Sequence, residues 1–190
     1  MDDFAMFENI RRHSFMVARV ASLLQRGLKQ SRIAVQFPDR DLVIAGALLH
    51  DIAKSRCLED NCRHAEVGAA LCTELGYPRI AEIVRNHVVL SRYRHESYRA
   101  GNFNAVELVF YADKRVRHDE VVTLDDRLEY IIGKYADNSP EQEALIVKNF
   151  MKCKDLEENL FACLDFSPAD VSVMVAEAPA ELRHYPPGLE

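Results

Sequence analysis

The adjacent residues His50 and Asp51 are the feature of this chain most capable of chemistry. They follow the apolar pair Leu48-Leu49 and supply one imidazole nitrogen and one carboxylate from consecutive positions. Both groups are suitable ligands for divalent cations such as Fe, Mn, Zn, Co or Ni. Two ligands alone do not hold a metal, so the prediction of a metal site depends on whether other side chains reach the same point.

Four further His and Asp residues interrupt apolar stripes of predicted helices. These residues are His13, His64, His87 and Asp113. In one stripe, Ile80, Ile83 and Val84 precede His87 at the i, i+3, i+4, i+7 spacing of a buried helix face. A single inward histidine is usually a hydrogen-bonded core residue. Several unpaired polar groups in one core would cost roughly 1–3 kcal/mol each, whereas one shared cation satisfies them together. The set therefore favours a metal site.

The elements that must position these ligands are predicted to be helices, which makes the fold class all-α. Apolar residues recur at helical spacing between breakers, and alternating β-type runs are few. Predicted helices cover about residues 7–27, 42–49, 62–75, 78–88, 104–117 and 124–135, and two more begin at Ser139-Pro140 and Ser167-Pro168. Asp39 is the expected N-cap of the second helix. Gly46, between two alanines, is small enough for a close helix neighbour.

The length of 190 residues predicts one domain over residues 1–175. Residues 176–190 are rich in Pro, Ala and Glu and are expected to form a linker-like tail, which an adjacent domain could follow. The sequence does not indicate an oligomeric state.

Composition excludes several classes of partner and compartment. The net charge of −6 disfavours a nucleic-acid binder. No apolar segment approaches the roughly 18 residues of a membrane span, and the start lacks the features of a signal peptide, so a cytoplasmic location is expected. An odd number of cysteines without CxxC spacing predicts reduced packing residues rather than disulfides. These cysteines are Cys57, Cys62, Cys72, Cys153 and Cys163.

With these features, the chain resembles the HD-domain metal-dependent phosphohydrolases. The motif order of that family is a His, then His-Asp, then a late Asp, and the matching pieces are His13-Ser14, Leu49–Lys54 and Ala112-Asp113-Lys114. The resemblance covers about residues 8–120. It implies a five-helix metal-binding core, to which the chain adds C-terminal helices.

The resemblance also implies a ligand set. The first metal would be held by His13, His50, Asp51 and Asp113. The second would be held by His64 and His87 with Asp51 bridging, because HDIG-type members and the bacterial diadenosine-tetraphosphate hydrolases carry second-metal ligands at these places. Those hydrolases are the nearest in motif, since they tolerate the alanine found at position 53. Alarmone and cyclic-dinucleotide hydrolases are disfavoured, because Ser55-Arg56 replaces a Glu-Asp pair and no Gly-Tyr-Pro follows a histidine.

Such a site would hydrolyse phosphate compounds. Two divalent cations, two carboxylates and a bridging hydroxide leave a net charge of about +1, which attracts phosphate. The metals would generate the hydroxide near neutral pH and clamp the phosphoryl oxygens. Asp51 and Lys54 are the predicted catalytic residues, although Lys54 is equally well interpreted as a solvated lysine at a helix end. Candidate phosphate contacts are Arg85, Arg92, Lys114, Arg115 and Arg117, whereas His95 and His118 are expected at the surface.

The sequence therefore predicts a hydrolase of a phosphoester or phosphoanhydride bond in a small nucleotide or related phosphometabolite. Dinucleoside polyphosphates are the first expected substrates and nucleoside monophosphates the second. The alternative is a noncatalytic HD module that binds metal or nucleotide and regulates a partner or adjacent domain. A third interpretation, a helical interaction domain without metal, must explain each inward His and Asp separately.

Overall fold

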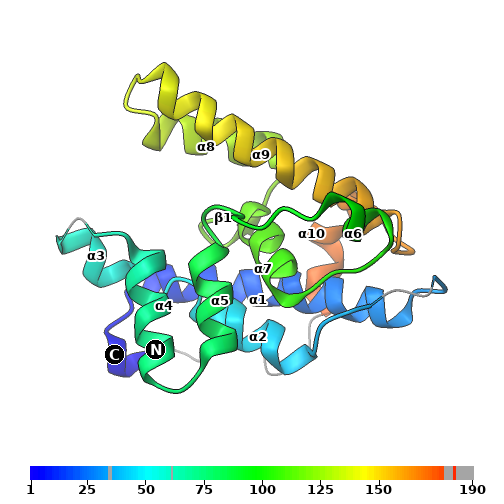
Figure 1. Cartoon of the computed structure of the whole chain (residues 1–190), viewed down its shortest axis with the longest axis horizontal. Coiled ribbons are helices and arrows are strands. Elements are labelled where there is room, and N and C mark those ends of the chain that lie inside the picture. Colours follow the sequence, from blue (N-terminus) through cyan, green and yellow to red (C-terminus); the bar gives the residue numbers. More distant parts are fainter. Residues whose placement is uncertain (34–35, 61, 178–181, 183–190) are drawn as a thin grey trace.

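The computed structural model describes residues 1–33, 36–60, 62–177 and 182, and these residues are overwhelmingly helical (Figure 1). The predicted all-α fold class is confirmed. A two-stranded antiparallel hairpin joins β1 (Val116–Arg117) to β2 (Glu120–Val121), with Val116 opposite Val121. This hairpin was not predicted, because two-residue strands carry too little alternation to be recognised.

The helices predicted for the N-terminal core are all present. They are α1 (Glu8–Gln30), α2 (Arg40–Leu49), α4 (His64–Glu74), α5 (Pro78–Asn86) and α7 (Ala105–Lys114). Asp39 caps α2 as predicted, since its side chain accepts a 2.9 Å hydrogen bond from the Leu42 amide. The first helix continues past its expected end at Gly27. That glycine serves packing, because a Cβ there would lie 2.7 Å from the Leu164 side chain.

Two short helices occupy segments outside the predicted helices. They are α3 (Lys54–Asp60) and α6 (His95–Arg99), and a 3-10 turn, η1 (Asp2–Phe4), precedes α1. Helices of one or two turns show no full apolar period in the sequence and are stabilised by tertiary packing.

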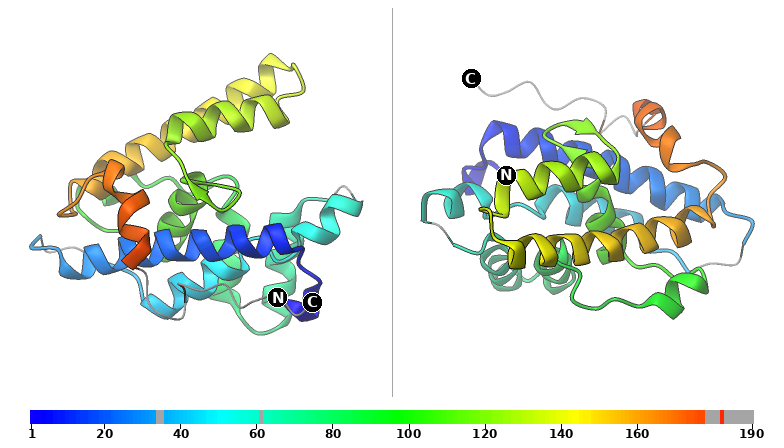
Figure 2. Two further views of the ribbon diagram at one scale, coloured as in Figure 1. Left: turned by 180° about the vertical axis from the view of Figure 1, so that it is seen from behind. Right: turned by 90° about the horizontal axis from the view of Figure 1, so that it is seen from above.

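The C-terminal part forms a helical hairpin and a terminal turn. The hairpin consists of α8 (Leu124–Tyr135) and α9 (Pro140–Phe161), and Figures 1 and 2 show it projecting over the rest of the molecule. Ser139 caps α9 by accepting a 3.3 Å hydrogen bond from the Gln142 amide. The segment expected to form a helix after Ser167 is a series of short helical turns. It consists of η2 (Pro168–Asp170), α10 (Val171–Met174) and η3 (Val175–Glu177).

The main core is centred on α7, which contacts α1, α2, α5 and α9. Every residue from Leu108 to Ala112 is fully buried. Leu182 is also buried in this core, with 3% of its surface exposed, so packing continues beyond residue 175. Residues 178–181 and 183–190 of the expected tail lie outside the described residues.

Close helix packing at two glycines brings the ends of α2, α4 and α5 together. A Cβ at Gly46 would lie 2.5 Å from the Ile83 side chain, and one at Gly68 would lie 2.9 Å from the Val84 side chain. The prediction that Gly46 faces a close helix neighbour is confirmed. As a result, the residues that follow α2 and α5 meet those that begin α4.

The expectation of five reduced cysteines is wrong for two of them. Cys57 and Cys62 form a disulfide, because the chain turns back at the end of α3 and brings their Cα atoms to 4.6 Å. Cys72, Cys153 and Cys163 are free and buried, as expected. Sequence spacing did not reveal the pair, because the reversal of the chain depends on α3, which was not predicted.

No helix in the described part of the chain is both long enough and apolar enough to cross a membrane.

Candidate metal centre

The six side chains predicted as metal ligands converge on one buried point. They come from α1, the turn after α2, the first residue of α4, the turn after α5, and α7. In chain order these residues are His13, His50, Asp51, His64, His87 and Asp113. All of them are buried except His64, whose side chain is 26% exposed.

His50 and His87 are oriented in the same way. Each follows the last residue of a helix and donates its Nδ1 hydrogen to the carbonyl three residues earlier, His50 to Ala47 and His87 to Val84, both at 2.6 Å. The last carbonyls of a helix have no partner within the helix. Each of these two bonds therefore satisfies one such carbonyl at the C-terminal end of its helix. They also fix the tautomer in which the Nε2 lone pair is free for a metal.

His13 reaches the cluster from α1 with help from the β-hairpin. Its Nδ1 donates to the backbone carbonyl of His118 at 2.8 Å, and its Nε2 lies 3.0 Å from Oδ1 of Asp113. His118 has the left-handed φ of 57°. The hairpin turn therefore holds the imidazole of His13 in place through its backbone.

Asp51 lies at the centre, and its two oxygens face different groups of imidazoles. Oδ2 lies 3.4 Å from Nε2 of His50 and 4.0 Å from Nε2 of His13. Oδ1 lies 3.3 Å from Nε2 of both His64 and His87. A carboxylate placed in this way has one oxygen available to each of two neighbouring sites.

The cluster fits a divalent cation. Nε2 of His50 and Oδ1 of Asp51 are buried and make no well-formed hydrogen bond. Two triads have ligand atoms within 4.8 Å of one another, namely His13-His50-Asp113 and His50-Asp51-His87. Buried polar atoms without partners are costly, and a cation between them removes that cost. A mixed set of imidazole nitrogens and carboxylate oxygens suits several first-row metals.

The ionisation of four of these groups also suits metal binding. At His50, in contrast, burial is outweighed by the carboxylate of Asp51, which raises the pKa. Burial lowers the pKa of His87 to about 4 and also lowers the pKa of His13. Burial alone would raise the pKa of Asp51, but the charges of Lys54 and His50 outweigh it and hold that pKa well below its usual range. The pKa of Asp113 is likewise low, because Lys114 and His13 outweigh its burial. Near neutral pH, His13 and His87 are uncharged and both carboxylates are ionised, which are the forms that bind metal.

Three cationic side chains surround the two carboxylates. Nζ of Lys54 lies 2.6 Å from Oδ2 of Asp51, and Nζ of Lys114 lies 2.6 Å from Oδ2 of Asp113. Arg127 of α8 places a guanidinium nitrogen 3.9 Å from Oδ1 of Asp113. The floor of the site is therefore cationic even before a metal binds.

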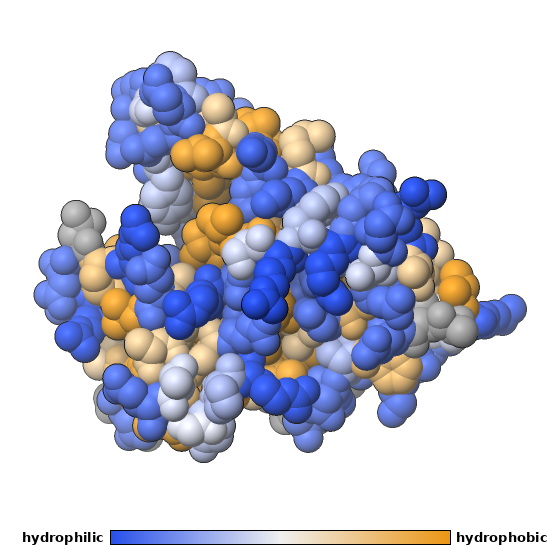
Figure 3. Space-filling view, viewed as in Figure 1, coloured by the Kyte–Doolittle hydropathy of each residue, from blue (hydrophilic) through white to orange (hydrophobic). Residues whose placement is uncertain are grey.

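A pocket of about 490 Å³ opens over the cluster, between the core and the α8–α9 hairpin. Its floor includes Lys54, His64, His87, Asp113, Lys114 and Arg127. Figure 3 shows apolar surface gathered where the hairpin projects over the body. The pocket connects the metal-ligand cluster to solvent.

Of the predicted phosphate contacts, Lys114 alone lines this pocket among the described residues. Arg85 and Arg92 are exposed elsewhere on the surface. Arg115 is buried, because its guanidinium pairs with Glu157 at 3.2 Å and bonds the Pro168 carbonyl at 2.9 Å. It stabilises the attachment of the C-terminal helices instead of facing the site.

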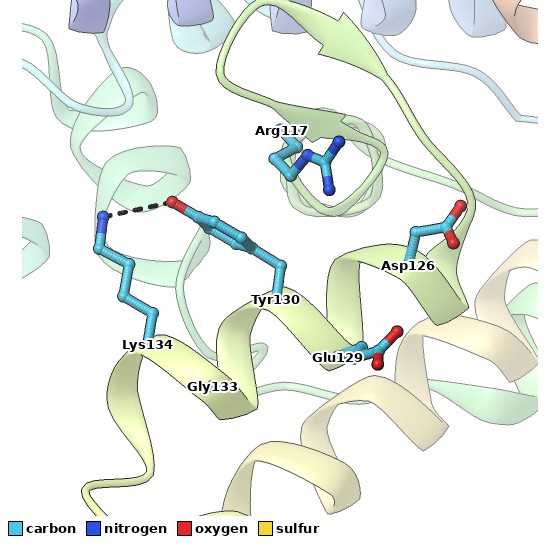
Figure 4. Close-up of a pocket in the computed structure, with 6 residues that line it drawn as sticks. All are labelled: Arg117, Asp126, Glu129, Tyr130, Gly133 and Lys134. Carbon is cyan, nitrogen blue, oxygen red and sulfur yellow. Dashed lines mark hydrogen bonds between the residues drawn. The ribbon is translucent and has the colours of Figure 1, made fainter.

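Arg117 lines a separate surface pocket, shown in Figure 4, together with Tyr130 and Lys134 of α8. Within the described residues, that pocket shares no lining residue with the one over the cluster. Adjacency in sequence to Asp113 therefore does not bring Arg117 to the site, because β1 carries it away from the end of α7.

Sequence reasoning missed two contributors to the site. Arg127 was not singled out, although it is a charged residue on the apolar stripe that contains Leu124 and Ile131, and only 8% of its surface is exposed. The backbone of His118 has no sequence signal that connects it to His13. The imidazoles of His95 and His118 lie outside the cluster, as expected; Nδ1 of His95 lies 3.1 Å from Asp155.

Comparison with known proteins identifies the family of this chain. An uncharacterized protein of Methanocaldococcus jannaschii is 28% identical over 151 residues, which cover 75% of this chain and 86% of that protein. No solved structure matches the chain. The family model of the HD domain, a domain that binds divalent metals and generally acts in metal-dependent phosphohydrolases, matches residues 10–131. Because this match covers more than half of the chain, the protein belongs to the HD-domain family.

Proposed function

We propose that this protein is a metal-dependent phosphohydrolase with two divalent metals bridged by Asp51. The observation that carries the proposal is the placement of the two Asp51 oxygens between two groups of imidazoles. His13, His50 and Asp113 would hold the first metal with Oδ2 of Asp51. His64 and His87 would hold the second with Oδ1.

The metals and the surrounding cations have separate parts in the reaction. When bound, divalent metals make water nucleophilic near neutral pH and neutralise phosphoryl oxygens. Lys114 and Arg127 line the same pocket and bind further phosphoryl oxygens by charge-assisted hydrogen bonds. Both lie beside Asp113, so the phosphoryl group would bind above the α7 end of the cluster.

Lys54 is the candidate for stabilising the leaving oxygen. Burial would lower its pKa, but the carboxylates of Asp51 and Asp113 outweigh burial and raise it. Its Nζ therefore keeps its proton and places a positive charge at the edge of the pocket, where 29% of its side chain is exposed. Charge that develops on a departing oxygen would be stabilised there.

The substrate is proposed to be a small phosphorylated metabolite with a phosphoester or phosphoanhydride bond. Dinucleoside polyphosphates and nucleoside monophosphates are the nucleotides to screen first, because the ligand motifs resemble those of enzymes that act on such compounds. Fe, Mn, Zn, Co and Ni are all compatible with the ligand set.

The test is metal-dependent turnover. We would reconstitute the protein separately with each metal and assay p-nitrophenyl phosphate, bis-p-nitrophenyl phosphate and the nucleotides. Wild type and the control His95→Ala, which changes a histidine outside the cluster, are expected to turn over substrate. His50→Ala and Asp51→Asn are expected to lose activity. Stoichiometric metal without turnover of any phosphate compound would contradict the proposal and favour a noncatalytic HD module.

A further inference from the structure

The walls of the pocket over the metal-ligand cluster are strongly apolar. They come from α3, the segment after α5, and both helices of the hairpin. Six aliphatic side chains line them, namely Leu58, Val88, Val89, Ile131, Leu145 and Ile146. Phe150 and the Cys57–Cys62 disulfide add further apolar surface.

Several of these residues are unusually exposed for their type. Leu58 is 64% exposed, Val89 is 53% exposed and Leu145 is 68% exposed. They come from three separate elements, yet all line one pocket. Contiguous exposed apolar surface of this kind is typical of a binding site.

The cations of the pocket are confined to its floor. Lys54 and Lys114 contact the carboxylates of Asp51 and Asp113, and Arg127 lies beside Asp113. Among the described residues of the walls, Tyr135 and Asn149 supply the hydrogen-bonding side chains. The Asn149 amide nitrogen donates to the Val88 carbonyl at 2.9 Å, and its Oδ1 is one buried acceptor that has no hydrogen-bond partner in the described part of the chain. The pocket is thus cationic at one end and apolar at the other.

We propose that the substrate is a phosphomonoester of an apolar alcohol, with its phosphoryl group on the floor and its alkyl or aryl group against the aliphatic walls. This inference rests on the proposed function, because it assigns the floor to the phosphoryl group. Water attacks phosphorus and gives up one proton, the bond from phosphorus to the alcohol oxygen breaks, and that oxygen takes up one proton. The products are the free apolar alcohol and inorganic phosphate.

Polyphosphates and nucleotides suit this pocket less well. A polyphosphate chain would carry further negative charges up walls where the described residues offer no second group of cations. The hydroxyl groups of a ribose outnumber the polar side chains of the walls, which are Tyr135 and Asn149 among the described residues, so part of the ribose would lie against aliphatic side chains. Polar groups that lose water without gaining a hydrogen bond weaken binding. An alkyl or aryl group gains affinity from the same surface.

Binding of phosphonates separates recognition from turnover, because a phosphorus–carbon bond is not hydrolysed. Calorimetry on the metal-loaded full chain would compare hexylphosphonate with 2-(2-hydroxyethoxy)ethylphosphonate, which has a polar chain of equal length, and with α,β-methylene-ADP. We expect hexylphosphonate to bind about tenfold more tightly than either.

Substitutions at exposed positions identify the wall without disturbing the core. Leu58→Asn and Leu145→Asn are each expected to weaken hexylphosphonate binding about fivefold and to leave the polar phosphonate unchanged. The matched control is Leu75→Asn, which alters an exposed leucine at the end of α4 that does not line the pocket. It is expected to change neither affinity.

The outcomes distinguish this inference from the proposed function. Equal or tighter binding of the polar phosphonate or of α,β-methylene-ADP would overturn the apolar substrate, even if phosphate esters are hydrolysed. Selective binding of hexylphosphonate that both wall variants weaken would support it. If hexyl phosphate is then bound selectively but never hydrolysed, the proposed hydrolysis is refuted and the apolar recognition remains.

Discussion

Two histidines of the metal-ligand cluster owe their orientation to the helices that they end. The Nδ1 hydrogens of His50 and His87 satisfy free carbonyls at the ends of α2 and α5, and their Nε2 atoms consequently face Asp51. The imidazoles are therefore positioned before any metal binds. Such preorganisation raises metal affinity, because little side-chain freedom is lost on binding.

His118 provides a test of backbone positioning at the residue scale. Its carbonyl holds His13, whereas its imidazole lies outside the cluster, and its φ of 57° disfavours β-branched residues. His118→Gly is expected to keep the metal content and to change the free energy of unfolding by less than about 1 kcal/mol. His118→Val is expected to lower that free energy by about 1–2 kcal/mol.

Denaturant titration and elemental analysis of both His118 variants check this expectation. Loss of metal from His118→Gly would show that the imidazole itself contributes to the site, in contradiction to its position outside the cluster.

A substitution at Lys54 distinguishes an effect on turnover from an effect on metal binding. Lys54→Gln is expected to reduce turnover about 100-fold while the metal content stays unchanged, because the ammonium group acts on the leaving oxygen. The matched control is Lys29→Gln, which alters an exposed lysine near the end of α1. Steady-state kinetics and metal analysis measure the two effects. Unaltered turnover in Lys54→Gln would leave Lys54 an ion-pair partner of Asp51 with no part in the reaction.

The sequence predicted the ligands better than the residues around them. His13, His50, Asp51, His64, His87 and Asp113 all reach one cluster, because each lies on or beside an apolar stripe that must face the core. The sequence did not indicate in the same way where the arginine and lysine side chains lie. Arg115 and Lys114 are adjacent, yet the first turns to Glu157 and the second to Asp113. Long charged side chains find partners that depend on tertiary packing, which sequence spacing does not reveal.

At the scale of elements, the well-predicted helices are those with a full apolar period, and a side-chain cap adds to the signal in α2 and α9. Asp39 and Ser139 mark the starts of α2 and α9, and both caps are present. In contrast, α3 and α6 are too short to show a period, and the Cys57–Cys62 disulfide was missed together with α3. Packing at Gly46 was foreseeable, because small residues permit close approach of helices.

Two glycine substitutions test that packing. An alanine at Gly133 of α8 would meet nothing within 4 Å, whereas one at Gly46 of α2 would lie 2.5 Å from Ile83. Gly133→Ala is expected to raise the free energy of unfolding by up to about 1 kcal/mol through helix propensity. Gly46→Ala has the same propensity gain but is expected to be about 1–3 kcal/mol less stable than Gly133→Ala because of overpacking.

Chemical denaturation of the two glycine variants under one set of conditions gives this difference directly. Equal stability would mean that α2 and α5 can separate without cost, and that Gly46 does not set the distance between His50 and His87.

At the scale of the whole molecule, the placement of the α8–α9 hairpin determines the shape of the site. It supplies Arg127 to the floor and Leu145 to the wall of the pocket. Both helices were predicted, but their position over the cluster was not, because it depends on contacts between distant segments such as Arg115 with Glu157. Substrate recognition was consequently the part of the function least accessible from sequence.

Metal binding is expected to stabilise the whole molecule, because the cluster joins side chains on or beside α1, α2, α4, α5 and α7. A metal at 100 times its dissociation constant adds about 2.7 kcal/mol to the free energy of unfolding. For a chain of this size, that corresponds to a rise in Tm of roughly 5–10 °C. Calorimetry before and after chelation would measure it; an equal rise in Asp51→Asn would show that the metal binds elsewhere.

Elemental analysis of the purified chain, after anaerobic reconstitution with Fe, Mn and Zn in turn, tests whether Asp51 bridges two metals. Wild type would be compared with Asp51→Asn and with the control His95→Ala. We expect about two metal ions per chain in wild type and in His95→Ala, and loss of both from Asp51→Asn, because one carboxylate bridges the two sites. Wild type without stoichiometric metal, or Asp51→Asn with the same content as wild type, would contradict the account.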